Sequence, residues 1–136
     1  MKLTQEKCEA CQVGAPKVTS EEQEQFLQEL DDWIVITEVK ETRNYVDNET
    51  STTKKINKLF KEYKFKNYAL ALEFATQVAN LAEQENHHPL IALEWGRVRV
   101  WWWTHAIEGL HKNDFVCAAK QMNFKWIKFL LSIQAV

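Results

Sequence analysis

The pattern of hydrophobic and polar positions divides the chain into segments with different periods. Ser20 stands before an acidic first turn, which predicts a first helix near residues 20–30 because a serine side chain can cap the free N–H groups there. The β-branched residues over 33–39 predict a strand, and alternation over 59–65 predicts a second strand with one exposed face. The polar stretch over 40–55 lies between them and is predicted to form a long turn or loop.

A second amphipathic helix follows, and Asn67 is its predicted N-cap. Its apolar positions recur at three- and four-residue intervals; they are Tyr68, Ala71, Leu72, Ala75, Val78, Ala79 and Ala82. The helix should end by His87, because Pro89 disfavours helical geometry at the residue before it. Two alternating runs, 91–95 and 98–102, flank Gly96 and predict a β-hairpin.

The last predicted helix begins after Gly109 and runs to the end of the chain. One apolar stripe follows a four-three spacing and consists of Phe115, Ala119, Met122, Trp126, Phe129 and Ile133. Ile127, Leu130 and Leu131 add apolar area outside this stripe, which a helix with one solvated face would not need. We therefore expect this C-terminal helix to mediate self-association.

Taken together, these segments predict an α+β fold. It would have an antiparallel four-stranded sheet with three helices packed on one face, in the order α-β-β-α-β-β-α. Residues 1–19 would form a short N-terminal extension and residues 20–136 a single domain, because a chain of 136 residues fits one ordinary domain.

Composition narrows the class of protein. Hydrophobic residues make up 46% and charged residues 26%, both close to the average for globular domains, and the formal net charge is -2. No overall positive field exists to attract nucleic acid, and no apolar run approaches the roughly 18 residues of a membrane-spanning helix. The charged N-terminus lacks the apolar segment of a signal peptide, so a cytoplasmic protein is expected. We interpret the six lysines between 54 and 66 as the solvated side of an exposed strand.

The three cysteines fall in two places: Cys8 and Cys11 form a C-x-x-C pair, and Cys117 stands alone. A closed zinc site needs four ligands, and a thioredoxin-like pair would follow a strand within a βαβ unit. Neither context is present in the sequence. We interpret the cysteines as ordinary reduced thiols near a frayed terminus, with redox sensitivity and weak metal binding as the alternatives.

Three of the four histidines fall between residues 87 and 105. His87 and His88 stand at a junction before Pro89, and Glu83 lies one helical turn before His87. His105 closes the second hairpin strand, whose end should return toward that junction. Imidazoles beside a carboxylate suit acid/base elimination or isomerisation near neutral pH. Plain polar surface and a zinc site are the alternatives at this point, although no recognised metal-ligand spacing occurs.

The segment Glu83-Gln-Glu-Asn-His87-His88-Pro89, followed by Thr104-His105 and by Gly109-Leu110 with Asp114, resembles the pterin-4a-carbinolamine dehydratase family. The similarity extends over roughly residues 20–130 and includes the aromatic strand before Asn67. This resemblance implies an enzyme that removes water from 4a-hydroxytetrahydropterin, the 4a-carbinolamine, to give quinonoid dihydropterin. Such an enzyme recycles the pterin cofactor of aromatic amino acid hydroxylases. The resemblance also implies that no metal or organic cofactor is required.

The same resemblance implies the site residues. His87, His88 and His105 match the three site histidines of the family and Glu83 its site carboxylate, so these four are the expected catalytic residues. The expected pterin-binding residues are Asn86, Trp103, Thr104 and Asp114, together with the three histidines. Trp103 departs from the family pattern, which more often has a small polar residue at that position.

The resemblance further implies homodimers that pair into homotetramers through helices. A pterin is the expected ligand, and an aromatic amino acid hydroxylase is the expected neighbour in the same pathway. Nucleic acid and membranes are not expected as partners. The alternative from another class is a non-catalytic binding module, because some relatives act as dimerisation cofactors or assembly factors for a partner protein. The complete histidine set favours the enzyme.

Overall fold

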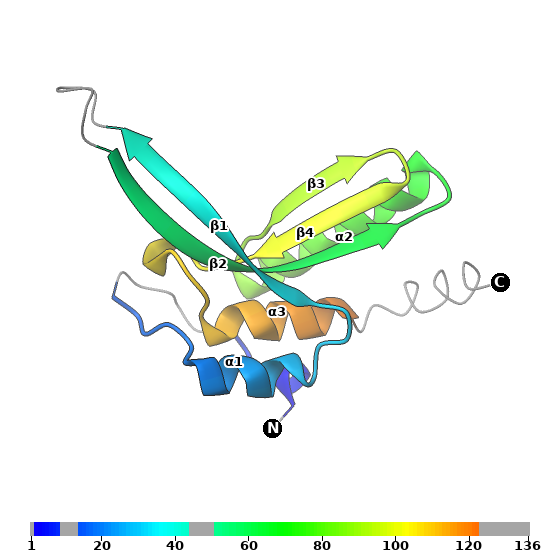
Figure 1. Ribbon diagram of the computed structural model, residues 1–136. Coiled ribbons are helices and arrows are strands. Elements are labelled where there is room, and N and C mark those ends of the chain that lie inside the picture. The colour runs from blue at the N-terminus through cyan, green and yellow to red at the C-terminus, as the bar shows by residue number, and fades with distance from the viewer. Residues whose placement is uncertain (1, 9–13, 44–50, 123–136) are drawn as a thin grey trace.

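The computed structural model describes residues 2–8, 14–43 and 51–122 (Figure 1). Within these ranges the chain forms one four-stranded antiparallel sheet in the order β1-β2-β4-β3. The elements are η1 (Leu3–Gln5), α1 (Ser20–Leu27), β1 (Ile34–Arg43), β2 (Ser51–Lys64), α2 (Tyr68–Glu85), β3 (Leu90–Glu94), β4 (Arg97–Trp102), η2 (His105–Ile107) and α3 (Lys112–Met122). The predicted α+β class and the order α-β-β-α-β-β-α are confirmed.

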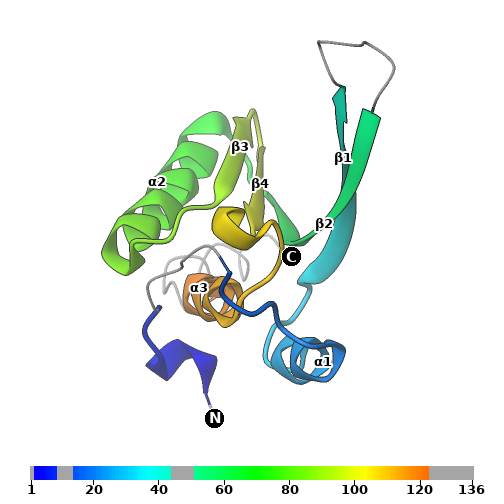
Figure 2. The same ribbon diagram turned by 90° about the vertical axis from the view of Figure 1, so that its left-hand side faces the viewer.

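The hydrophobic core lies between the sheet and the helices. Helix α2 packs on β3 and β4, and α3 packs on β2 and β4, so both cover the same face of the sheet (Figure 2). Helix α1 joins this layer through Phe26, whose ring centroid lies 5.2 Å from that of Phe115 on α3. On β4 the alternating residues Val98, Val100 and Trp102 are fully buried, as their spacing predicts.

The predicted loop is wrong at residues 40–43 and 51–55, because these belong to the paired strands β1 and β2 of a long arm. Residues 44–50 of the predicted loop lie outside the described residues. Strands β1 and β2 pair in continuous register from Ile34↔Phe60 to Arg43↔Ser51, and the arm leaves the body of the molecule (Figure 1). Residues 52–55 of the arm are all exposed, so they show no alternation of hydrophobic and polar side chains. A strand that is solvated on both faces carries no periodic signal, and for that reason the pattern indicated a loop.

The starts of the first two helices follow capping rules. Thr19, not Ser20, is the N-cap of α1: its hydroxyl accepts from the Glu22 N–H at 3.1 Å, and the Glu22 carboxylate accepts from the Thr19 N–H at 3.0 Å. The predicted N-cap of α2 is confirmed, since the Asn67 side chain accepts from the Leu70 N–H at 2.8 Å. The buried stripe of α2 differs in part from the predicted one and consists of Ala71, Phe74, Ala75, Val78, Leu81 and Ala82.

Helix α3 is described as far as Met122. Its first stripe residues, Phe115 and Ala119, are buried, and Met122 packs partly against the core. The stripe residues Trp126, Phe129 and Ile133, and the second apolar group Ile127, Leu130 and Leu131, lie outside the described residues. In the described ranges, every helix is too short or too polar to cross a lipid bilayer.

Candidate active site

Backbone geometry at the end of α2 turns His87 into the protein. The helix ends at Glu85, and Asn86 adopts the left-handed conformation (φ 51°, ψ 41°), which asparagine tolerates better than most residues. The His87 N–H donates to the Ala82 carbonyl at 3.1 Å. The His87 ring lies nearly parallel to the Trp102 ring, with 5.7 Å between centroids and 14° between planes, and the residue is only 8% exposed.

Asp114, in the first turn of α3, is the carboxylate partner of His87. Nε2 of His87 lies 2.6 Å from Oδ1 of Asp114, which is fully buried. The second carboxylate oxygen accepts from the Thr104 hydroxyl at 2.8 Å and from the His111 backbone N–H at 2.9 Å. These donors and the positive end of α3 surround the carboxylate. The arrangement fixes the His87 ring and compensates its charge when the ring is protonated.

His105 lies at the start of η2, just beyond the end of β4. Its ring contacts the Trp103 ring, with 4.2 Å between centroids. Partial removal of the ring from water is the main cause that lowers the pKa of His105 below 6.5; the neighbouring charges of His87 and Lys58 lower it further, and Asp114 acts in the opposite direction. His87 and His105 therefore interact electrostatically, and His105 favours its neutral form near pH 7.

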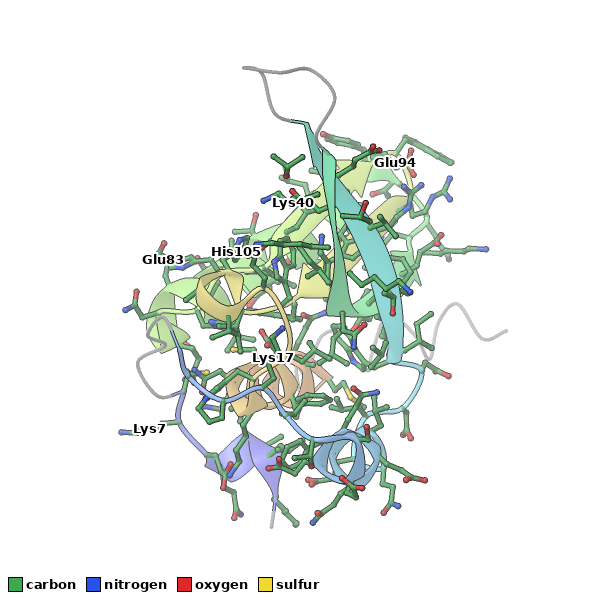
Figure 3. All side chains as sticks on the ribbon, turned by 60° about the vertical axis from the view of Figure 1, so that its left-hand side comes forward. Lys7, Lys17, Lys40, Glu83, Glu94 and His105 are labelled. Carbon is green, nitrogen blue, oxygen red and sulfur yellow. The ribbon has the colours of Figure 1, made fainter. Side chains whose placement is uncertain are left out.

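A cavity of about 560 Å³ opens between the β1–β2 arm and His105. Its wall includes Glu38 and Lys58 from the arm, and Trp103 and His105 from the segment that follows β4. Figure 3 shows His105 beside the arm that carries Lys40. The volume lies in the range of small-molecule sites, and the wall combines the flat ring of Trp103 with several charged and polar side chains.

Lys58 is buried, contrary to the interpretation of the 54–66 lysines as solvated side chains. It is 8% exposed, its Nζ lies 2.6 Å from Oε2 of Glu38, and the same nitrogen lies 3.9 Å from the centroid of the Trp103 ring. The carboxylate and the aromatic face together replace the water that a lysine normally keeps. The sequence does contain a signal for the burial of Lys58, because this residue shares its strand face with the apolar Ile56 and Phe60.

The structure brings Glu83 to His88 and not to His87. Oε1 of Glu83 lies 3.3 Å from Nε2 of His88, and both side chains are largely exposed, at 79% and 54%. The left-handed turn at Asn86 separates the two histidines, since it sends His87 inward and leaves His88 at the surface. Figure 3 shows Glu83 on the outer side of the molecule. Of the three rings, His88 is paired with Glu83 at the surface, while His87 acts electrostatically on His105.

Candidate metal ligands do not gather in the ranges that the structure describes. Within residues 2–8, 14–43 and 51–122, no three His, Cys, Asp or Glu side chains lie close enough together to hold a metal ion. The carboxylate beside His87, that of Asp114, instead binds the His87 ring, the Thr104 hydroxyl and the His111 backbone N–H. This arrangement suits proton transfer between positioned groups.

Comparison with known proteins identifies the family of the chain. A family model described as "Pterin 4 alpha carbinolamine dehydratase" matches residues 16–124. A protein of Vibrio cholerae serotype O1, named "Putative pterin-4-alpha-carbinolamine dehydratase", is 52% identical over 118 residues, which cover 87% of this chain and 94% of the relative. A protein of Photobacterium profundum with the same name is 48% identical over 114 residues, or 84% of this chain and 88% of the relative.

A solved structure from Brucella melitensis shares the fold. It is described as a transcriptional coactivator/pterin dehydratase and superposes with a TM-score of 0.59 at 25% sequence identity, covering 79% of this chain and 96% of that chain. The family match includes the elements that carry His87, His105 and Asp114. On this sequence and structural evidence, the chain belongs to the pterin-4a-carbinolamine dehydratase family.

Proposed function

We propose that the protein dehydrates 4a-hydroxytetrahydropterin to quinonoid dihydropterin by histidine acid/base catalysis. The observations that carry the proposal are the pairing of His87 with buried Asp114 and the electrostatic influence of both on His105, which lines a cavity together with Trp103. Two imidazoles in different environments can move protons in opposite directions during one reaction. A pterin substrate and a hydro-lyase reaction fit the family.

In the proposed reaction, His105 accepts the N5 proton of the substrate and His87 donates a proton to the departing 4a-hydroxyl. The C4a–O bond breaks, water leaves, and the N5 electron pair forms the C=N bond of the product. Because Asp114 occupies Nε2 of His87, the proton is delivered from Nδ1. Solvent then returns a proton to His87 and removes one from His105, which restores the site. Positioned acid/base groups contribute about 10²–10⁴-fold to such a rate.

The remaining predicted site residues receive separate roles in this proposal. Asp114 and Thr104 are positioning residues, because Asp114 binds the His87 ring and the Thr104 hydroxyl donates to Asp114. Trp103 forms part of the cavity wall that would face the pterin. Asn86 shapes the turn before His87, while His88 and Glu83 form a surface pair that can hold the polar edge of the substrate.

A direct assay tests the proposed activity. Purified protein is added to freshly generated 4a-hydroxytetrahydropterin, and the appearance of quinonoid dihydropterin is followed by absorbance. We expect the rate to rise in proportion to protein concentration above the buffer-catalysed reaction. A rate equal to that of buffer alone, with protein that is folded by circular dichroism, would contradict the proposal.

Lys58 provides a test of the electrostatics around His105. Replacing Lys58 with Met keeps most of the apolar length of the side chain but removes a positive charge that lowers the pKa of His105. We expect the pKa of His105, measured by NMR titration, to be below 6.5 in the wild type and to move upward in Lys58→Met. The exposed Lys64→Met, on the same strand, is the matched control and should leave it unchanged. A downward shift in Lys58→Met would refute the assignment.

Metal removal should leave the activity intact. We read the histidines as proton carriers, whereas a catalytic zinc would need them as neutral ligands around an open coordination position. We expect dialysis against a chelator to change kcat by less than twofold. Plasma mass spectrometry of the same samples gives the metal content. Stoichiometric zinc that is lost together with the activity would overturn this interpretation.

The second candidate function is a binding module for a partner protein. It is supported by the description of the Brucella melitensis structure, which names a transcriptional coactivator beside the dehydratase. Absence of dehydratase activity in folded protein would favour this candidate.

We also propose a cytoplasmic protein with a single domain over residues 20–136. We further propose that the protein assembles as a homodimer or homotetramer through the C-terminal helix. Its product would supply an aromatic amino acid hydroxylase in the same pathway.

A further inference from the structure

Two cysteines that are far apart in the sequence meet behind the candidate active site. Sγ of Cys8 lies 3.4 Å from Sγ of Cys117, across a separation of 109 residues. Cys117 is fully buried on α3, one helical turn after Asp114, whereas Cys8 lies just after η1 and is partly exposed. The C-x-x-C spacing groups Cys8 with Cys11 in the sequence. In the fold, however, the Cys8 thiol contacts Cys117, the cysteine that stands alone in the sequence.

Several contacts hold Cys8 against α3. Its backbone N–H donates to Oε2 of Glu85 at 3.3 Å, and its thiol donates to the Asn113 carbonyl at 3.7 Å. The other oxygen of Glu85 binds Lys120 of α3, so one carboxylate joins the N-terminal segment to the helix. Cys8 is thus held through its backbone N–H and through its thiol, and its approach to Cys117 does not depend on the two sulfurs alone.

The segment before Cys8 is anchored as well. Leu3 is fully buried, and its N–H donates to Oε1 of Glu29 at 3.0 Å. Oε2 of Glu6 lies 2.6 Å from Nζ of Lys112 at the start of α3. These contacts fix residues 2–8 along the helix. A disulfide needs its sulfur atoms at roughly 2.05 Å. The packing therefore leaves only a short movement between the thiol pair and a bond.

We propose that Cys8 and Cys117 form an oxidisable dithiol, a modification site that reacts with small-molecule disulfides and closes into an intrachain bond between the N-terminal segment and α3. The bond would link residues across nearly the whole domain, so it would remove much of the freedom of the unfolded chain. The protein would then have a reduced form and a covalently locked oxidised form, with the same fold in both.

The reaction is a double thiol–disulfide exchange. The Cys8 thiolate attacks a sulfur of oxidised glutathione, which releases one glutathione and leaves a mixed disulfide at Cys8. The Cys117 thiolate then attacks the Cys8 sulfur and releases the second glutathione. The two cysteine protons end on the two glutathione thiols, so one disulfide is reduced and one is formed. Cys8 reacts first because it is partly exposed, whereas Cys117 is fully buried.

The buried thiol becomes more reactive once Cys8 has reacted. The hydrogen bond with the Cys8 thiol raises the pKa of Cys117 most strongly, and burial and the charges of Cys8, Glu85 and Asp114 add to the effect. A mixed disulfide at Cys8 removes the thiol proton and the charge of that residue. Two of the causes that keep Cys117 protonated are then absent, which favours the second exchange over the return of glutathione.

Peptide mapping after oxidation tests the proposal. Native protein is incubated with oxidised glutathione, free thiols are blocked with N-ethylmaleimide at acid pH, and the chain is cut with trypsin. Cleavage after lysine yields the peptides 8–17, with Cys8 and Cys11, and 113–120, with Cys117. We expect these two peptides to be joined, and the number of free thiols in the denatured chain to fall from three to one.

Three variants assign the bond. Cys11→Ser should still give the joined peptides, and Cys8→Ser and Cys117→Ala should not. In the wild type, oxidation should raise the Tm by about 10 °C, because a loop of this size is closed in the unfolded chain. Peptide 8–17 lighter by two hydrogens without peptide 113–120 attached would overturn the proposal, since it would show a Cys8–Cys11 bond. Full blocking of Cys117 or a disulfide between two chains would overturn it equally.

Discussion

Replacing His105 with Gln is expected to lower kcat for carbinolamine dehydration by more than tenfold, and by about 10²-fold if the ring supplies the whole base contribution. Glutamine keeps a polar side chain beside Trp103 but cannot accept the N5 proton. The lowered pKa of His105 keeps its ring neutral near pH 7, so the wild-type base is available there. Steady-state kinetics over a range of pH measures the effect, which should fall mainly on kcat and less on KM.

His111→Gln is the matched control for this substitution. His111 contributes its backbone N–H to Asp114 and accepts from the Asn113 N–H through Nδ1, so its side chain has no place in the proposed proton transfers. We expect kcat of this variant to stay within about twofold of the wild type. Equal kcat values for wild type and His105→Gln, with both proteins folded, would remove His105 from the chemistry.

Asp114→Asn should damage both stability and activity. The carboxylate accepts from the His87 ring, the Thr104 hydroxyl and the His111 N–H, and an amide offers one acceptor oxygen in place of two. We expect the free energy of unfolding to fall by roughly 2–4 kcal/mol, because a fully buried site then holds donors without acceptors. We also expect kcat to fall by more than tenfold, since a protonated His87 loses its counter-charge.

Urea unfolding and steady-state kinetics measure these two losses. The exposed Asp31→Asn carries the same change in formal charge and should alter the free energy of unfolding by less than about 0.5 kcal/mol. Asp114→Asn also tests the direction of an electrostatic effect, because the charge of Asp114 raises the pKa of His105. In Asp114→Asn the pKa of His105 should therefore move further down. A stable variant with wild-type kcat would show that the buried carboxylate does not support His87.

The layout of the sheet and helices could be predicted because their periodic signals are local. Alternation over Val98, Val100 and Trp102 identifies a half-buried strand, and Gly96 identifies its turn. The β1–β2 arm could not be predicted in this way, because side chains exposed on both faces leave no periodic trace. The stripe of α2 was misplaced for a related reason. Small alanines contribute little to the choice of face, and Phe74 determines which side enters the core.

The candidate site could be predicted only in part. His87 and His105 follow from the residue types and the hairpin topology, but Asp114 was available only through the family resemblance. Its contact with His87 spans 27 residues and depends on where α3 docks, which no local spacing encodes. The same holds for Cys8 and Cys117. The pairing of Glu83 with His88 depends on one left-handed residue, Asn86, and a helical extrapolation to His87 could not include it.

The most direct test of the account is the kcat of the double variant His87→Gln/His105→Gln. The two histidines act in the same dehydration step, so their losses should not multiply fully, and the double variant should resemble the slower single variant within about tenfold. Circular dichroism and urea unfolding confirm that the protein is folded. We expect a rate close to that of buffer alone, with substrate still bound. A folded double variant that retains wild-type kcat would contradict the proposed mechanism.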